Sequence, residues 1–592
     1  MNYKERPLSP KQVKPRGILA QRLRHSLDRL IRERAMHTAY AGWGADQIGR
    51  WIGATVLESC LLTDTSVPSI IQEKVEELCM AQDENGLFYG AGLRNNPERF
   101  RECWFGHGRG IWNLLEYCEI TGDETAFASL LTAADHAVAT RDTWQIAKPL
   151  CGGIESSVGP MAHLGQITHR QEYIEYARYM ADNIQHNIAQ PSQFPTAHVD
   201  STNLHTHEEK PFFHHTHSYL NTTHGVVDLA VVTGEAKYVD QAKKAFADSF
   251  SSVWINGGFP ESYGDYYERI DETCSVVDWI VLGLKLFDLT GEARYLDSVE
   301  LSAVNQLLFG QDSNGTFTCY RSLNRHHWAD PRNRGCPQNE CCAMSGGWGL
   351  AQVAMHTITK NANGLSVNLP FDVRTVIERD GGEIHVEQSV LTGCSEVVQN
   401  IEVDNRAHHG IEVSIRVPYW VQEPHLRVKG SHCEVHPQHG FVRIMCPKNS
   451  TYSIVLRLPM SLQTIPAGCN ALTRDKETSA ISAKEQGIQY GPYVLMLNRV
   501  MYPEIVQRDI SVTVHLNSEG HPIVHQNCPA EWRVHTGAVP LFLEATVQDG
   551  SPVLLTPCAN LTMTALTVDD PYILRFANIN TSPLLKRSPN EN

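Results

Sequence analysis

The sequence predicts a multidomain protein in which an all-helical N-terminal part is followed by C-terminal β-sandwich domains. Three observations support this class: the length of 592 residues, helical patterns up to about Asn363, and strand patterns beyond that point. Such a chain exceeds what one hydrophobic core holds, so we expect two to four domains. We place a helical domain at 1–363 and two β-sandwich domains at 364–475 and 476–592.

A short turn motif recurs in the helical part, where one amphipathic run ends and the next begins. It occurs at Thr121–Asp123, Thr233–Glu235 and Thr290–Glu292, each time with a central glycine that is typical of a helix C-cap. The intervals of 112 and 57 residues predict one helix pair in roughly 55 residues. Repeated pairs bury their apolar faces on neighbours, in an open solenoid or in a closed toroid of two helix rings. We take the closed (α/α)6 toroid as the prediction.

The pattern changes after the helical part. Segments such as "GGEIHVEQSVLTG", "HHGIEVSIRVPYW", "GFVRIMCPKNSTYSIVLRLPM" and "GPYVLMLNRV" alternate apolar and polar residues and are rich in β-branched side chains. They are bounded by Gly, Pro and Asn, which is typical of strands in a sandwich. A helical toroid ahead of β-sandwiches is common among carbohydrate-active enzymes, but the site has to decide the function.

Charge and composition exclude several classes of partner. The formal net charge of −16 argues against nucleic acid, because phosphate backbones are bound by clustered Lys and Arg. No run approaches the ~20 apolar residues of a membrane span, and the charged N-terminal segment lacks a signal-peptide pattern. We therefore expect a cytoplasmic protein whose sixteen cysteines are mostly reduced thiols. The sequence leaves open whether the protein forms a homodimer.

Two distant segments carry residues that suit a metal. Glu272 and Cys274 form a Glu-x-Cys pair, and the adjacent Cys341 and Cys342 follow 67 residues after Cys274. Neighbouring cysteines rarely form a disulfide with each other, whereas three thiolates and one carboxylate suit Zn²⁺. The spacing matches no standard zinc motif, so from spacing alone buried thiols beside a surface carboxylate remain the alternative.

These segments resemble the β-L-arabinofuranosidase family of glycoside hydrolases. The motifs that carry the resemblance are "NGGFPES", "DETC", "ECCAM", "GADQIGRWIGA", "FGHGRGIWNLLEYCEITGD", "HHTHSYLNTTHGVVDLA", "IRVPYW", "LRLPM" and "YGPYVLML". The resemblance implies a Zn²⁺ site formed by Glu272, Cys274, Cys341 and Cys342. It also implies that Cys341 is the nucleophile and Glu261 the acid/base of an enzyme that acts on an oligosaccharide or glycoside.

The same resemblance implies a set of substrate-binding residues: Asp46, His107, His215, His217 and Tyr320. The alternative for these histidines is a satisfied core or surface position. A separate metal cluster of His214, His215 and His217 is disfavoured, because three histidines within four helical residues cannot all face one point. Trp104, Trp112 and Trp348 could stack on sugar rings, but packing between helices is the commoner role of such side chains.

Three positions depart from the family pattern. Cys151 stands where the family has a histidine, which leaves the bound sugar open. Glu261 precedes Glu272 by only eleven residues, a shorter connection than the pattern leads us to expect. The Cys pair is followed by Ala343 and not by Pro-Pro-Asn, and a Cys-Pro-Gln-Asn run beginning at Cys336 precedes it, so Cys336 is a reserve ligand.

The implied reaction is the two-step retaining hydrolysis of a β-L-arabinofuranoside or a related glycoside, with sulfur in place of the usual carboxylate nucleophile. Zinc would keep the thiol ionised near neutral pH. Two alternatives stay open. One is an enzyme of the same architecture with another chemistry, such as a uronyl hydrolase, lyase or sugar epimerase. The other is a non-catalytic carbohydrate-binding or scaffold protein with a structural zinc.

Overall fold

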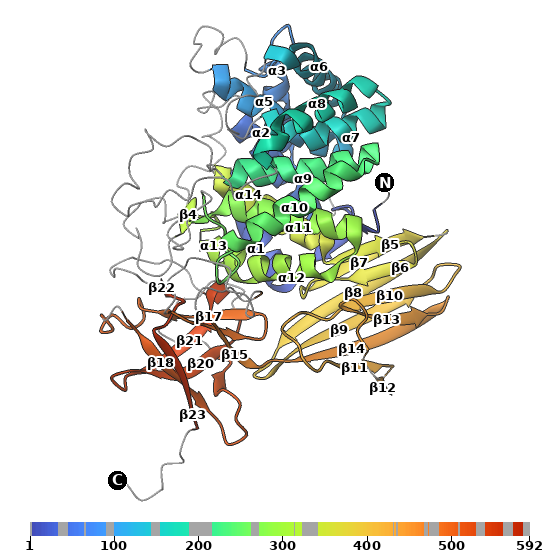
Figure 1. Cartoon of the computed structure of the whole chain (residues 1–592). Coiled ribbons are helices and arrows are strands. Elements are labelled where there is room, and N and C mark those ends of the chain that lie inside the picture. Colours follow the sequence, from blue (N-terminus) through green and yellow to red (C-terminus); the bar gives the residue numbers. More distant parts are fainter. Residues whose placement is uncertain are drawn as a thin grey trace, which may run out of the picture.

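The protein consists of a helical part followed by a strand-rich part, as Figure 1 shows for this computed structural model. The structure describes residues 3–32, 45–63, 67–89, 100–143, 154–188, 216–261, 271–312, 314–321, 341–379, 381–429, 431–433, 436–466, 472, 485–506, 509–527, 539–560 and 572–583. The prediction of helices followed by strands is confirmed. In the described part of the chain no helix is apolar over the length that a bilayer crossing requires.

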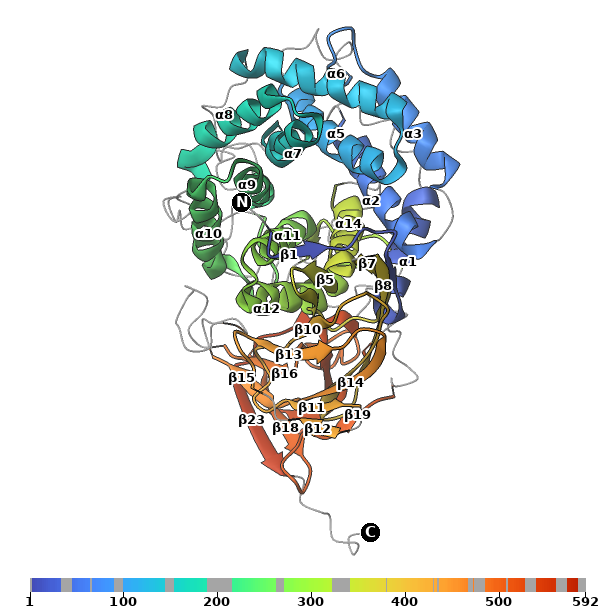
Figure 2. The same ribbon diagram turned by 90° about the vertical axis from the view of Figure 1, so that its right-hand side faces the viewer.

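One set of helices lines the inside of the helical part (Figure 2). These are α2 (Asp46–Leu62), α5 (Phe100–Thr121), α7 (Val158–Thr168), α9 (Thr216–Thr233), α11 (Thr273–Thr290) and α14 (Cys341–His356). Each contacts the next in this order, and α14 contacts α2 again, so the contacts close on themselves. Almost every described residue of α2, α11 and α14 is buried, which is typical of helices covered on all sides.

A second set of helices packs on the outside of the first (Figure 2). It comprises α1 (Gly17–Arg32), α3 (Ser69–Met80), α6 (Glu124–Thr140), α8 (Gln171–Ile188), α10 (Ala236–Ser249) and α12 (Ala293–Leu301). These helices are amphipathic and bury one stripe; α1, for example, buries Leu19, Leu23 and Leu30. An apolar stripe of this width is the pattern expected of a helix with one solvent-facing side.

The recurrent turn motif connects inner helices to outer ones. Gly122, Gly234 and Gly291 have φ angles of 72°, 74° and 68°, a left-handed conformation that glycine adopts without a Cβ clash. Asp123 then caps α6 by accepting hydrogen bonds from the amides of Thr125 and Ala126, both at 3.0 Å. The predicted turns are therefore confirmed at all three positions.

Short elements complete the helical part. They are the 3₁₀ turns Arg141–Thr143, Ile154–Ser157 and Phe250–Ser252, the π-helical turn Ser302–Leu307, α13 (Leu308–Gly310), and the two-residue strands β3 (Asp271–Glu272) and β4 (Tyr320–Arg321). Strands β3 and β4 pair antiparallel, with Glu272 opposite Tyr320. This small pairing ties the segment before α11 to the segment that precedes α14.

Two sheets follow the helices. The first has the order β1-β5-β6-β10-β13 and the second the order β12-β11-β14-β9-β8-β7-β2. Their strands are β1 (Glu5–Pro7), β2 (Val13–Pro15), β5 (Ile358–Asn361), β6 (Gly364–Val367), β7 (Val373–Arg379), β8 (Gly382–Thr392), β9 (Glu396–Asn405), β10 (Ile411–Arg416), β11 (His425–Val428), β12 (Ser431–Cys433), β13 (Phe441–Cys446) and β14 (Ser450–Pro459). Strands β8, β10, β13 and β14 lie within the segments predicted as strands.

A third sheet contains nine strands, with the path β15-β16-β17-β21-β20-β18-β23, while β19 pairs with β20 and β22 with β17. Its strands are β15 (Leu462–Ile465), β16 (Gly487–Tyr490), β17 (Tyr493–Asn498), β18 (Ser511–Leu516), β19 (Val524–His525), β20 (Phe542–Val547), β21 (Pro552–Pro557), β22 (Tyr572–Ile573) and β23 (Asn578–Pro583). The 3₁₀ turn Cys558–Asn560 contacts α13 and the π-helical turn. This sheet therefore also packs on the helical part.

The N-terminal residues belong to the sheets. Strand β1 pairs with β5, and β2 pairs with β7. The buried carboxylate of Glu5 accepts hydrogen bonds from Thr359 at 2.6 Å and Ser366 at 2.9 Å. The first two sheets thus take strands from both sides of the proposed boundary at 363, and the division into 1–363, 364–475 and 476–592 stays a prediction.

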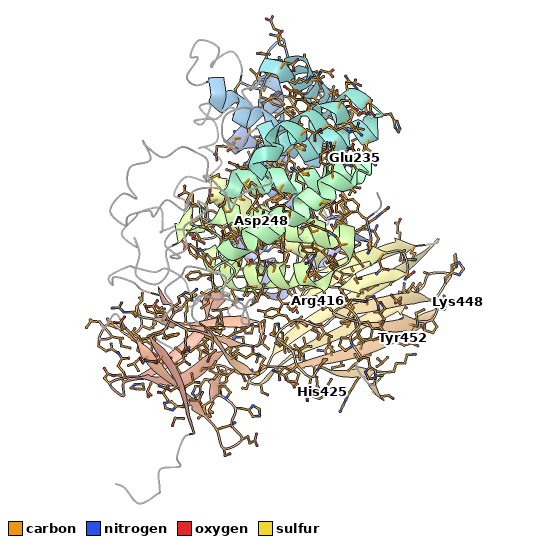
Figure 3. The ribbon with its side chains drawn as sticks, viewed as in Figure 1. Glu235, Asp248, Arg416, His425, Lys448 and Tyr452 are labelled. Carbon is orange, nitrogen blue, oxygen red and sulfur yellow. The ribbon has the colours of Figure 1, made fainter. Side chains whose placement is uncertain are left out.

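A buried ion-pair network joins the helices to the first sheet. Arg416 on β10 is labelled in Figure 3, where it lies between the helical and strand-rich parts. Its guanidinium contacts Glu300 at 2.7 Å and Asp297 at 2.8 Å on α12, and the indole of Trp420 donates to Glu300 at 2.7 Å. A buried charge of this kind is costly to leave unpaired, so these ion pairs join the two parts of the protein.

Candidate metal centre and active site

The four side chains predicted as metal ligands converge. One ligand atom from each of Glu272, Cys274, Cys341 and Cys342 lies within 4.8 Å of all the others. The sulfur atoms of Cys274 and Cys342 are 3.3 Å apart, and those of Cys341 and Cys342 are 3.9 Å apart. Sulfurs on a tetrahedral zinc ion with 2.3 Å bonds are separated by roughly 3.8 Å. The spacing and the chemistry of these donors therefore fit Zn²⁺.

The fold brings the ligands together at the ends of two neighbouring inner helices. Glu272 ends β3 and Cys274 lies in the first turn of α11, while Cys341 and Cys342 open α14. Helices α11 and α14 contact each other directly. The N-terminal end of a helix carries a partial positive charge, which stabilises thiolates placed there.

The three thiols differ in burial and in acidity. Cys274 and Cys342 are fully buried, whereas Cys341 is partly exposed. Hydrogen bonds with Cys274 and Cys342 lower the pKa of Cys341 well below its ordinary value, and nearby Arg50 adds to this effect. Burial raises the pKa of the other two thiols. Cys341 is thus the most accessible sulfur of the three and the one most readily ionised.

A buried arginine on α2 reaches the sulfur cluster. Nη1 of Arg50 lies 3.8 Å from Sγ of Cys274 and donates to Oγ of Ser345 at 2.9 Å. Nε donates to Asp46 at 2.9 Å, which is an i,i+4 ion pair. Burial alone would lower the pKa of Arg50, but Asp46 and the thiols of Cys274 and Cys341 raise it above its ordinary value. The guanidinium therefore stays charged beside the thiols.

His217 connects this arginine to a buried aspartate. Nη2 of Arg50 lies 2.9 Å from Nε2 of His217, and an arginine can only donate, so Nε2 accepts and the ring proton is on Nδ1. Nδ1 in turn hydrogen-bonds Asp278. Burial would raise the pKa of Asp278, but the contacts with His217 and His224 lower it well below its usual range. The ring of His217 is therefore held from both sides.

Glu261 lies on a segment attached to the start of α9 and α11. Its backbone carbonyl accepts a hydrogen bond from the amide of Thr216 at 2.9 Å. The hydroxyl of Thr216 donates to Ser275 at 2.7 Å, and Ser275 donates to the carboxylate of Glu272 at 2.9 Å. A short chain of hydrogen bonds therefore links the backbone of Glu261 to the carboxylate of Glu272. The side chain of Glu261 is partly exposed.

Asp46 and His217, two of the residues predicted to bind substrate, lie in the network next to the cluster. Asp46 is buried; besides Arg50 it accepts a hydrogen bond from Gln47 at 2.9 Å and lies 3.6 Å from Nε of Arg109. Both ring nitrogens of His217 have protein partners. A direct contact of Asp46 or His217 with sugar stays a prediction.

The structure does not bring His107 to the cluster. Its ring is fully buried between α5 and α6, where Nε2 lies 3.0 Å from the carbonyl oxygen of Ala133. It packs near Phe88 and His136, with ring centroids 5.4 and 5.5 Å away, and burial lowers its pKa to about 3. These contacts favour the core position that stood as the alternative to sugar binding, and a role of His107 in sugar binding stays a prediction.

Several candidate residues fall outside what the structure describes. These are Cys151, His214, His215 and Cys336, together with the side chains of Trp104 and Tyr320. The backbone of Tyr320 is described and pairs with Glu272 across β3 and β4. The separate histidine cluster and the reserve ligand therefore stay predictions.

Two of the tryptophans pack against each other between inner helices. The rings of Trp112 and Trp348 are 5.3 Å apart and nearly perpendicular, and the indole of Trp348 donates to Glu116 at 3.0 Å. The guanidinium of Arg109 lies 4.4 Å from the centre of the Trp112 ring. These contacts favour the packing role.

Sequence reasoning missed Arg50, Asp278 and Ser345. Each lies four residues after a candidate that it did identify: Asp46, Cys274 and Cys341, respectively. Residues spaced by four lie on one face of a helix, so a polar or charged side chain at that spacing was the available signal.

Comparison with protein families gives a match over most of the helical part. Residues 18–354 match the GH127 catalytic domain of β-L-arabinofuranosidases. The chain belongs to this family. It is accordingly a glycoside hydrolase, which confirms the predicted resemblance and the prediction of an enzyme, and the non-catalytic alternative is set aside. No match was found among curated proteins.

The GH127 fold extends over nearly the whole chain. A solved glycoside hydrolase superposes with a TM-score of 0.75 at 14% identity, covering 98% of each chain. A GH127 β-arabinofuranosidase gives 0.70 at 16% identity, covering 98% of this chain and 100% of that one. A GH127 β-L-arabinofuranosidase from Geobacillus stearothermophilus T6 gives 0.65 at 14% identity, covering 94% of both. At such identities the likeness establishes the fold.

Proposed function

We propose that this GH127 member is a retaining glycoside hydrolase that releases β-L-arabinofuranose or a related sugar from an oligosaccharide or glycoside. Cys341 would be the nucleophile and Glu261 the acid/base. The observation that carries the proposal is the convergence of Glu272, Cys274, Cys341 and Cys342, with Cys341 the most exposed of the three thiols. The solved GH127 relatives are described as β-arabinofuranosidases, which supports the choice of sugar.

The proposed cofactor is Zn²⁺, held by Glu272, Cys274, Cys341 and Cys342. When bound, zinc would keep the thiol of the nucleophile ionised and positioned near neutral pH. Three sulfurs and one carboxylate favour zinc over harder ions such as Mg²⁺ or Ca²⁺, which prefer all-oxygen sites. The helix ends that carry Cys274 and Cys341 support the same preference for anionic ligands.

The chain's own residues account for both steps of the reaction. In the first, Sγ of Cys341 attacks the anomeric carbon while Glu261 gives its proton to the departing glycosidic oxygen, so a carbon–sulfur bond forms as the carbon–oxygen bond breaks. In the second, Glu261 takes a proton from water, and the resulting hydroxyl replaces the sulfur at the same carbon. Two inversions give net retention of configuration.

The position of Glu261 supports its role. Its carbonyl is hydrogen-bonded to the first residue of α9, and the Thr216–Ser275 pair joins that point to Glu272. The segment that carries the acid is thereby fixed relative to the segment that carries two of the four proposed ligands. Such anchoring matters because a general acid acts only within hydrogen-bond reach of the leaving oxygen.

We further propose that the helical part is an (α/α)6 toroid and that the sheets form two β-sandwich domains at about 364–475 and 476–592. The closed order of contacts among the inner helices supports the toroid. Around the toroid's mouth, Asp46, His215, His217 and Tyr320 would contribute to sugar binding. A cytoplasmic location is supported by the ten described cysteines that are free thiols, although Cys319 is disulfide-bonded.

The proposal is tested with zinc-loaded protein and an aryl β-L-arabinofuranoside, compared with the α anomer and with other aryl glycosides. We expect release of the aryl group from the β-L-arabinofuranoside, with the β-configured sugar appearing first by NMR. Glu261→Gln should slow hydrolysis of poor leaving groups far more than that of good ones, because a good leaving group needs no proton. The first appearance of the inverted anomer, or a Glu261→Gln variant with unchanged rates, would contradict the mechanism.

A further inference from the structure

A thiolate centre of this kind carries excess negative charge. Three thiolates and one carboxylate bring four negative charges against the two positive charges of zinc. Glu272, Cys274 and Cys342 are nearly inaccessible to solvent, and a buried charge is costly unless a partner offsets it. The protein therefore has to supply positive charge close to the sulfurs, since water does not reach most of them.

Arg50 is placed to supply that charge. It is buried on α2, a different inner helix from those that carry the ligands, and its Nη1 lies 3.8 Å from Sγ of Cys274. The same nitrogen donates to the hydroxyl of Ser345 at 2.9 Å, and that hydroxyl lies 3.3 Å from Sγ of Cys274. The sulfur of Cys274 is therefore contacted by both the guanidinium and the hydroxyl.

Two other groups, Asp46 and His217, fix the orientation of the guanidinium. Asp46 binds Nε, and His217 accepts from Nη2. His217 is itself held by Asp278, which also lies near His224 at 3.4 Å and Asn221 at 3.3 Å. Because Nε and Nη2 are bound to Asp46 and His217, Nη1 is left to face Cys274 and Ser345. Such partners of metal ligands set ligand orientation and affinity.

We propose that Arg50 is a positioning residue that offsets the charge of the thiolate centre and, with Ser345, keeps Cys274 as a permanent ligand. Hydrogen bonds to a thiolate stabilise its charge and reduce its tendency to attack. In this centre the guanidinium of Arg50 and the hydroxyl of Ser345 make such contacts with the fully buried Cys274. The partly exposed Cys341 is therefore left as the sulfur that reacts. The inference rests on the proposed function only in that the centre binds zinc.

The test measures metal binding by the full-length protein, independently of turnover. Zinc affinity is obtained by competition with a chromophoric chelator, and Co²⁺ replaces zinc to report the sulfur-to-metal charge-transfer band. Arg50→Met should weaken zinc binding by about 10- to 100-fold, and Arg50→Lys should recover most of that loss because the charge is kept. Loss of hydrogen bonds to sulfur should move the cobalt band of Arg50→Met to longer wavelength.

Arg416→Met is the matched control, since it removes another buried arginine, one that is paired to acidic residues on α12 and not to thiols. We expect its folded form to bind zinc as the wild-type protein does. Wild-type affinity together with an unmoved cobalt band in Arg50→Met would overturn the proposal.

Ser345→Ala provides a second test in case Arg50→Met does not fold, because it removes only a hydroxyl. We expect zinc binding several-fold weaker than wild type and a cobalt band at longer wavelength; no change in either would overturn the inference. If the wild-type protein binds zinc and the variants weaken it, but no arabinofuranoside is hydrolysed, the proposed substrate fails while the role of Arg50 stands.

Discussion

Two buried arginines, Arg50 and Arg416, have different kinds of partner and different roles in this molecule. Arg416 is paired with the carboxylates of Glu300 and Asp297 and the carbonyl of Asn368. The partners of Arg50 are one carboxylate, a neutral imidazole, a hydroxyl and a thiol sulfur. The first set joins the helical part of the fold to the first sheet. The second directs positive charge at a thiol that can ionise and bind a metal.

Burial and pairing alone therefore do not identify a functional charge. What separates the two networks is the chemistry of the partners. Carboxylates and carbonyls satisfy a guanidinium permanently, whereas thiols gain acidity and metal affinity from it. Substitutions in and around each network can therefore distinguish a charge that stabilises the fold from one that supports the metal centre.

Cys341→Ser should lower turnover by at least about 1,000-fold, as removal of a nucleophile typically does, while the protein still unfolds in one transition near the wild-type temperature. The measurement is the initial rate on an aryl β-L-arabinofuranoside alongside circular dichroism. Cys394→Ser, an exposed thiol in the strand-rich part, is the control and should keep full activity. Comparable rates for both variants would remove Cys341 from the mechanism.

Arg416→Met should cost about 3–5 kcal/mol of unfolding free energy, because Glu300 and Asp297 would keep their charges without a partner. Denaturant titration in the presence of saturating zinc measures this loss. If the double variant Arg416→Met/Glu300→Gln recovers part of the stability, the loss in Arg416→Met comes from a carboxylate left without its partner. An Arg416→Met protein as stable as the wild type would mean that the interface network contributes little.

Asp278→Asn should weaken zinc binding by about 3- to 10-fold. An asparagine can turn its amide to donate to Nδ1 of His217, which would place the ring proton on Nε2, facing Arg50. The chelator competition described above measures the change. His224→Gln, which alters the weaker contact with the same carboxylate, should change the affinity less. Equal effects in the two variants would argue against a specific role for the His217 tautomer.

Glu5→Gln should change how stability depends on pH. Burial raises the pKa of Glu5 to about 7, above its value in the unfolded chain, so the folded state holds this proton more tightly. The contribution of Glu5 is therefore complete below about pH 4.5 and is lost as the pH rises to about 7, a loss of up to ~3 kcal/mol. Unfolding free energies at pH 5 and 8 should differ less in the variant than in the wild type.

Much of the architecture could be predicted because it depends on local patterns. The glycines at 122, 234 and 291 marked real helix ends, and β8 and β10 followed their alternating residues. Strands β1 and β2 were missed because they are three residues long, contain proline and pair with partners more than 300 residues away. No local signal specifies a pairing of that kind.

Some residues of the candidate site could likewise be predicted from the sequence, and others could not. The cluster of Glu272, Cys274, Cys341 and Cys342 could be predicted because residue types and a family resemblance pointed to the same four positions. Arg50 could not, since its role depends on which helices lie side by side. His107 sits in a segment that resembles a sugar-binding one, yet the rotation of α5 turns its ring toward α6, and sequence pattern alone does not fix that rotation.

Locating the sugar in the covalent intermediate would identify the nucleophile directly. Glu261→Gln protein, loaded with zinc, is mixed with a β-L-arabinofuranoside that has a good leaving group, quenched in acid within the first turnover, and digested for peptide mass spectrometry. We expect one pentose unit attached to Cys341. A pentose attached to Glu272 or to another side chain, with Cys341 unmodified, would contradict it.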